Sequence, residues 1–124
     1  MEKTIFDTTI IRHGESAKEM LAEKMIVLFG KEVPPLVDDI SFVHSSNELS
    51  AAPSKGDLLT IDDAVFEIDQ VGDLVYKNLS ELGHCVIQFV GKDFGEDILP
   101  GTFTVLAESM PPIDIDTVIK IKKK

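Results

Sequence analysis

Residues 73–90 read DLVYKNLSELGHCVIQFV, a helical pattern that changes directly into a strand pattern. The first part spaces apolar residues as on one face of a helix, at Val75, Leu79 and Leu82. Gly83 follows where a helix commonly ends in a left-handed residue. From there Cys85, Ile87 and Phe89 alternate with more polar neighbours. The stretch predicts a short helix over residues 74–82 and then a strand with one buried face.

Strand patterns recur on both sides of this stretch. We predict strands at residues 4–11, 25–29, 40–44, 58–61, 64–71, 85–90, 103–107 and 119–121. A second short helix is predicted near residues 17–23, with a capping box that begins at Ser16, and Pro34-Pro35 opens a turn with room for one helical turn. Many short strands with few helices are typical of a barrel or sandwich. We therefore predict a mainly β fold, a small antiparallel β-barrel-like domain with two short helices, as a single domain over residues 1–124.

The composition limits the classes of function. The chain has 124 residues, 44% of them hydrophobic, which is enough for a core. Asp and Glu total 22 against 12 Lys and Arg, a net charge of −10 that repels nucleic-acid phosphates and anionic lipid. No apolar run approaches the roughly 20 residues of a membrane span, and the first residues lack a signal-peptide pattern. We expect a cytoplasmic protein that neither binds nucleic acid nor inserts into a membrane.

The common catalytic motifs are missing from the sequence. The segment Gly91–Gly95 lacks the frame of a phosphate-binding loop. Three histidines and one cysteine are too few for a Cys/His zinc cluster, so we predict no metal site and no cofactor. Cys85 falls on the apolar face of its strand, where a buried, unreactive thiol is expected.

Of the three histidines, His44 offers the most chemistry. It ends a predicted strand, shares a face with Phe42, and precedes the polar residues Ser45, Ser46 and Asn47. One interpretation is a buried histidine with its hydrogen bonds satisfied. The other is a reactive imidazole, kept neutral by burial, with the three polar residues supplying donors to phosphoryl oxygens. The residues alone leave both open.

Several short motifs in order resemble one known family. They are Thr8-Thr9-Ile10, an Arg12-x-Gly14 turn, Phe42-x-His44 with Glu48-Leu49 behind it, Val71-Gly72, Asn78-Leu79-x-Glu81-Leu82-Gly83-His84 and Pro100-Gly101-Thr102. The ordered set resembles the glucitol/sorbitol-specific IIA component of the phosphoenolpyruvate-dependent sugar phosphotransferase system (PTS) over nearly the whole chain. The sequence departs from a relative directly after His44, where Ser45-Ser46-Asn47 replaces a Cys-His-Gly-like stretch.

The resemblance implies a cytosolic phosphocarrier. Such a protein accepts a phosphoryl group from the phosphocarrier HPr on a histidine and passes it to its IIB partner, and the IIB and IIC components take up and phosphorylate the sugar alcohol. The phosphorylated residue would be His44. His84 also falls on a family-like position, as a supporting donor or the rival acceptor.

Two other classes of function compete with the phosphocarrier. One is a non-enzymatic β-barrel adaptor that binds proteins and has structural histidines. The other is a metal-dependent barrel of the cupin type, which the lack of a His-x-His pair disfavours.

Overall fold

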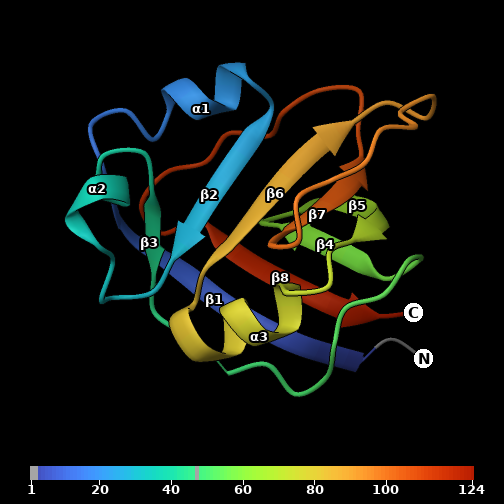
Figure 1. The fold of residues 1–124 in the computed structure, drawn as a ribbon, viewed down its shortest axis with the longest axis horizontal. Helices are drawn as coiled ribbons and strands as arrows, with labels where there is room; N and C mark the ends of the chain where they lie inside the picture. The colour runs from blue at the N-terminus through green and yellow to red at the C-terminus, as the bar shows by residue number, and fades with distance from the viewer. Residues whose placement is uncertain (1–2, 47) are drawn as a thin grey trace.

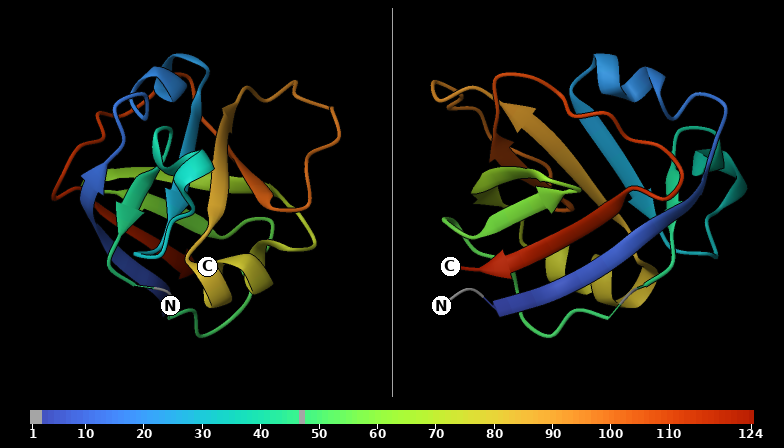
Figure 2. Two further views of the ribbon diagram at one scale, coloured as in Figure 1. Left: turned by 60° about the vertical axis from the view of Figure 1, so that its left-hand side comes forward. Right: turned by 180° about the vertical axis from the view of Figure 1, so that it is seen from behind.

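The eight strands of the chain form a closed barrel in the computed structural model, which describes residues 3–46 and 48–124. The strands follow the order β1-β3-β2-β6-β7-β5-β4-β8, and β8 pairs with β1 to close the barrel (Figures 1 and 2). Their bounds are β1 (Lys3–His13), β2 (Met25–Phe29), β3 (Phe42–His44), β4 (Leu58–Ile61), β5 (Ala64–Val71), β6 (Cys85–Val90), β7 (Thr102–Leu106) and β8 (Val118–Lys123). The prediction of a mainly β, barrel-like fold is confirmed.

The strand pairings are mostly antiparallel, as predicted, but two are parallel. Among the described residues, β2 runs parallel to β3 and β6 runs parallel to β7, while the other six pairings are antiparallel. Parallel neighbours need a crossover connection, whereas antiparallel neighbours can be joined by a tight turn. The segment with helix α2 (Pro35–Asp38) is the crossover from β2 to β3, and residues 91–101 connect β6 to β7. Side chains alternate in the same way in parallel and antiparallel strands, so the sequence pattern could not distinguish the two parallel pairings from the antiparallel ones.

Three short helices lie on the outside of the barrel in the described part of the chain. Two were predicted and correspond to α1 (Glu19–Ala22) and α3 (Val75–Leu82), and the third, α2, fills the turn that the two prolines open. The capping box predicted at Ser16 is wrong, because α1 begins later and has Lys18 at its N-cap without a side-chain hydrogen bond. Within residues 3–46 and 48–124, no helix has both the length and the apolar character to cross a membrane.

The core fills the inside of the barrel with the side chains that alternation predicted. On β6 the buried residues are Cys85, Ile87 and Phe89, and on β1 they include Phe6, Thr8 and Ile10. Large apolar side chains from the other strands complete this core, among them Leu28, Phe42, Leu59, Ile68, Phe103, Ile119 and Ile121. Most inward-facing residues are apolar, so the inward-facing Thr8 and His44 stand out as a polar pair within the barrel.

Candidate functional site

The site begins at His44, the last residue of β3, whose side chain is fully buried. Like Phe42, it faces the inside of the barrel, which confirms the face predicted for both. The antiparallel register places His44 opposite Ile10 of β1. The ring of Phe6 meets the imidazole edge to face, with the ring centres 5.7 Å apart. These contacts hold the imidazole in one orientation, and its burial was predicted by both interpretations of His44.

Both ring nitrogens of His44 make short hydrogen bonds. Nε2 lies 2.6 Å from the backbone carbonyl oxygen of Gly83, and Nδ1 lies 2.8 Å from Oγ1 of Thr8. Because a carbonyl oxygen only accepts, Nε2 must donate the hydrogen in this arrangement, and Nδ1 keeps the lone pair. Burial lowers the pKa of His44, and the hydrogen bond to Gly83 opposes this only in part. The imidazole is therefore neutral near pH 7.

Gly83 can approach His44 this closely because it is a glycine. It ends α3 in the left-handed conformation, with φ of 68°, as the sequence predicted. A Cβ atom at this position would lie 2.8 Å from the backbone nitrogen of Gly30 and 3.1 Å from Nε2 of His44. The amide of Gly30 also donates to the carbonyl of Leu82 at 3.0 Å. Two glycines thus bring the end of α3 against the end of β2 and over the imidazole.

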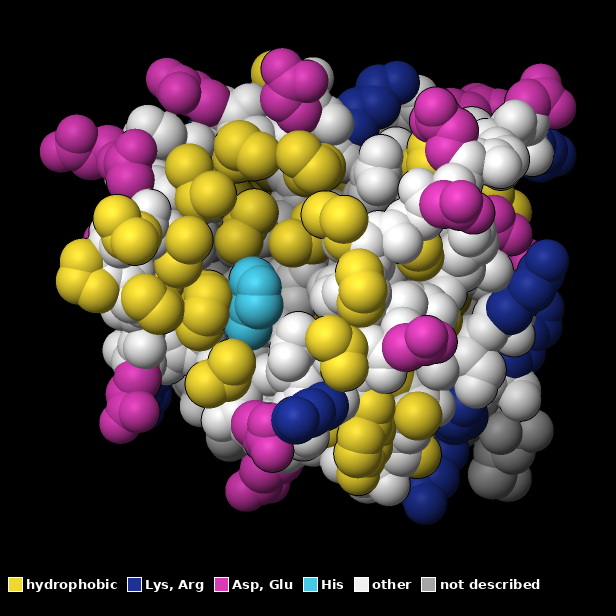
Figure 3. All heavy atoms as spheres, viewed as in Figure 1, with side chains coloured by type: hydrophobic (Ala, Val, Ile, Leu, Met, Phe, Trp, Pro, Cys, Tyr) yellow, Lys and Arg dark blue, Asp and Glu magenta, His cyan; other side chains and the backbone are white. Residues whose placement is uncertain are grey.

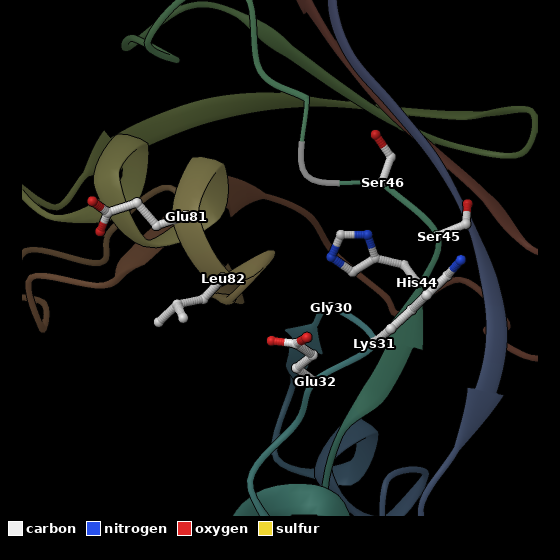
Figure 4. A pocket seen from close by; sticks show the side chains of 8 residues that line it. All are labelled: Gly30, Lys31, Glu32, His44, Ser45, Ser46, Glu81 and Leu82. Carbon is white, nitrogen blue, oxygen red and sulfur yellow. The ribbon is translucent and has the colours of Figure 1, made fainter.

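A pocket of about 440 Å³ opens beside this contact. Figure 4 shows the imidazole projecting between the end of α3 and the segment after β2, with one ring nitrogen on the side of Leu82 and the other on the side of Ser46. The lining residues are Gly30, Lys31, Glu32, His44, Ser45, Ser46, Glu81 and Leu82. The nitrogen on the Leu82 side is Nε2, since that nitrogen contacts the adjoining Gly83.

Ser45 and Ser46, predicted to contact phosphoryl oxygens, both line this pocket, while Asn47 lies outside the described residues. Their backbone amides are already used, because Ser45 donates to the carbonyl of Thr9 at 3.2 Å and Ser46 donates to Oγ1 of Thr8 at 3.1 Å. The two hydroxyl groups therefore keep their hydrogens for a ligand, and in Figure 4 both point away from the imidazole, so they would have to rotate to reach a phosphoryl group at the ring.

Three parts of the site were missed by the sequence analysis: the Thr8 hydroxyl, the Gly83 carbonyl and the Lys31 side chain. Lys31 lines the pocket, and Figure 4 shows its ammonium end directed toward Ser45, with a charge opposite to that of a phosphoryl group. Thr8 left a usable signal, since it is the polar member of the apolar face of β1. Lys31 left none, because a lone lysine after an apolar strand is the ordinary composition of a loop.

His84, the predicted supporting donor, lies between Gly83 and β6 and is half-buried. Its Nδ1 donates to the backbone carbonyl of Leu28 at 3.0 Å, and its ring stacks on Phe29 with centres 4.3 Å apart. His84 is not one of the described residues that line the pocket. A role as donor to a phosphoryl oxygen would need a second N–H at Nε2, which only the imidazolium form has.

The other reactive side chains lie away from the pocket. Cys85 is fully buried, and burial raises the pKa of its thiol, as an unreactive cysteine requires. His13 ends β1, with Nδ1 2.9 Å from the carbonyl oxygen of Gly14. Over residues 3–46 and 48–124, no group of three or more His, Cys, Asp and Glu side chains is arranged to hold a metal ion.

Comparison with known proteins gives one consistent result. The model of the family described as "PTS system glucitol/sorbitol-specific IIA component" matches residues 5–120. Glucitol/sorbitol-specific EIIA components of Shigella flexneri and Escherichia coli (strain K12) are each 30% identical to this chain over 118 residues, which is 95% of this chain and 94% of each relative. The crystal structure of a PTS system IIA component from Enterococcus faecalis V583 superposes with a TM-score of 0.80 at 25% identity, covering 92% of this chain and 97% of that chain.

Proposed function

The chain belongs to the glucitol/sorbitol-specific IIA component family of the PTS, and on this basis we propose that it accepts a phosphoryl group from HPr on His44 and passes it to the IIB component. As a member of this family it is a phosphotransferase component that carries phosphoryl groups between the proteins of the PTS chain. The proposal extends to the IIB and IIC components for glucitol/sorbitol as its downstream partners and to the cytoplasm as its location. The pairing of β1 with β8 supports treating residues 1–124 as one domain of this type.

The observation that carries the proposal is a neutral, buried imidazole at the wall of a polar pocket. A nucleophilic nitrogen needs a lone pair, and burial keeps one on His44 by lowering its pKa. The packing of the ring against Phe6 also limits the directions that it can take, and in-line attack on phosphorus requires a well-defined direction. In the transfer, the hydrogen of the neutral ring first moves from Nε2 to Nδ1, and a new bond then forms between phosphorus and the lone pair of Nε2 of His44. The bond between phosphorus and the donor imidazole breaks, and its electron pair stays on the donor nitrogen.

The proposed phosphoryl contacts come from residues that follow the neighbouring strands β2 and β3. The hydroxyl groups of Ser45 and Ser46 donate to phosphoryl oxygens, and the ammonium group of Lys31 offsets part of the negative charge. Asn47 was predicted as a third donor and stays a prediction. These contacts act on charge that is spread over three oxygens in the transition state, which is the main requirement of phosphoryl transfer.

The rim of the pocket suggests how a partner protein is recognised. Glu32 and Glu81 line the pocket, and Leu82 beside them is 53% exposed. Figure 3 shows hydrophobic side chains gathered over the face that carries α2 and β2, around a histidine that is partly visible at the surface. The two carboxylates repel free phosphate and attract basic side chains. We propose that HPr presents an apolar surface with basic residues to this rim, and binds only transiently so that the relay can turn over.

The test is a reconstituted relay with phosphoenolpyruvate, enzyme I and HPr. We expect the wild-type chain to gain one phosphoryl group that is labile in acid and stable in base, and to lose it when the IIB component is added. His44→Gln should fold and gain no label. Omitting HPr should abolish labelling, and labelling by enzyme I alone would overturn the choice of partner.

His84→Gln is the companion variant. If His84 donates to the phosphoryl group, the variant should still be labelled but more slowly, by about 10²-fold for one lost electrostatic contact. Loss of labelling in His84→Gln with full labelling in His44→Gln would show that His84 is the acceptor.

A further inference from the structure

A chain of hydrogen bonds fixes every proton around the imidazole of His44. Nε2 donates to the carbonyl of Gly83, so Nδ1 has the lone pair and accepts from the hydroxyl of Thr8. The backbone amide of Ser46 in turn donates to Oγ1 of Thr8. Each group has one role in this arrangement, and the described structure is therefore the Nε2–H tautomer of His44.

This tautomer cannot attack through Nε2, the nitrogen on the side of Leu82 (Figure 4). Nε2 carries a hydrogen, and its only lone-pair direction in the ring plane is occupied by the N–H bond. Attack at phosphorus through Nε2 requires the other tautomer, with the hydrogen on Nδ1. The group that faces Nδ1 must then accept a hydrogen bond where it previously donated one.

Thr8 is the residue that can make this exchange. A hydroxyl oxygen has one hydrogen and two lone pairs, so it can donate to Nδ1 in one tautomer and accept from Nδ1–H in the other. The second lone pair continues to accept from the amide of Ser46 in both states. Thr8 and His44 are almost completely buried, so bulk water does not replace the hydroxyl at Nδ1.

We propose that Thr8 is a positioning residue for phosphoryl transfer, acting by supporting both tautomers of His44. The inference rests on His44 being the phosphoryl acceptor. For the exchange, Nε2 leaves the carbonyl of Gly83 and the ring turns into the pocket, where Nε2 gives its proton to water and Nδ1 takes one from the same water, so the charge of the ring is unchanged. Nε2 then forms the bond to phosphorus, and the donor imidazole departs with its electron pair. Thr8 then accepts from Nδ1–H, which keeps the phosphorylated ring a good leaving group for the next transfer.

The test compares variants that differ only in the hydroxyl. Thr8→Val keeps the shape of threonine, and Thr8→Ala and Thr8→Ser differ from each other by a single oxygen. Thr104→Val is the matched control. Thr104 is also buried, and its hydroxyl also accepts a hydrogen bond from a backbone amide, that of Gln70 at 3.0 Å. It lies on β7, which is separated from β3 by β2 and β6 in the barrel. We expect Thr8→Val and Thr8→Ala to be labelled about 10- to 100-fold more slowly at saturating phospho-HPr, as loss of one hydrogen bond to a buried group implies. Thr8→Ser and Thr104→Val should stay within a few-fold of wild type.

A second readout separates positioning from simple stability. The ¹⁵N chemical shifts of the His44 ring report which nitrogen carries the hydrogen and the pKa of the ring. The shift of Nδ1 and the pKa of the ring should change in Thr8→Val and Thr8→Ala and return in Thr8→Ser, while the Gly83 carbonyl keeps the resting hydrogen on Nε2. Equal labelling rates for Thr8→Ala and Thr8→Ser, with equal ring shifts, would overturn the proposal. If wild-type label maps to a residue other than His44, the proposed acceptor fails, while the ring shifts still report whether Thr8 sets the tautomer.

Discussion

Gly83→Ala should push the end of α3 away from the strands that carry His44. The left-handed conformation of residue 83 costs a residue with a Cβ about 1–2 kcal/mol. The added carbon would also lie 2.8 Å from the nitrogen and 2.9 Å from the Cα of Gly30, which are backbone atoms that cannot turn aside. Overpacking of this kind costs about 1–3 kcal/mol. The sum predicts a loss of about 2–5 kcal/mol in the free energy of unfolding.

Gly56→Ala is the matched control for this change. Gly56 also has a positive φ, 91°, but a Cβ there would meet nothing within 4 Å. It should lose only the conformational part, about 1–2 kcal/mol. Urea denaturation of both variants gives the two free energies. The phosphorylation rate should change in Gly83→Ala alone, since only this change moves the carbonyl that holds Nε2. Equal losses of stability in the two variants would refute the close approach of Gly83 to Gly30 and His44.

Three further outcomes are expected. Burial lowers the pKa of His44 from 6.5, so on acidification the unfolded chain binds a proton at this residue before the folded chain does. The free energy of unfolding should therefore fall as the pH drops below 6.5, by at most about 1.4 kcal/mol per pH unit from this group. Urea titrations should show a flatter pH dependence in His44→Gln, and an unchanged slope would contradict the assignment. Leu82→Asp should raise the KM for phospho-HPr with little change in kcat, whereas Val65→Asp, at a residue 60% exposed on β5, should change neither. The buried Cys85 should react with a thiol reagent only after unfolding, and rapid modification of the folded protein would show that it is accessible.

The faces of the strands could be predicted because alternation is a local property. Phe6, Thr8 and Ile10 on β1 and Cys85 and Ile87 on β6 face inward as their period of two required. The left-handed end of α3 was likewise predicted from one residue, Gly83. The helix start was harder to predict, because a turn precedes the helix: the amide of Glu19 donates to the backbone carbonyl of Ser16 at 3.1 Å, and α1 has Lys18 as its N-cap.

The hydrogen bonds of His44 could not be predicted, because they depend on contacts far apart in the sequence. The register of β1 against β3, with Ile10 opposite His44, decides that Thr8 reaches Nδ1. The crossover through α2 makes β2 and β3 parallel, so that the end of β2 lies beside the end of β3, where Gly83 meets Gly30. A carbonyl 39 residues along the chain holds Nε2, and a hydroxyl 36 residues away in the other direction holds Nδ1.

The measurement that tests the central claim most directly is the position of the phosphoryl group on the intact chain. ¹⁵N-histidine-labelled protein, phosphorylated through enzyme I and HPr, should show coupling between ³¹P and one ring nitrogen. We predict that this nitrogen is Nε2 of His44, and that the hydrogen bond to Gly83 is lost in the same spectrum. A phosphoryl group on His84 or His13, or a chain that gains none, would contradict the account.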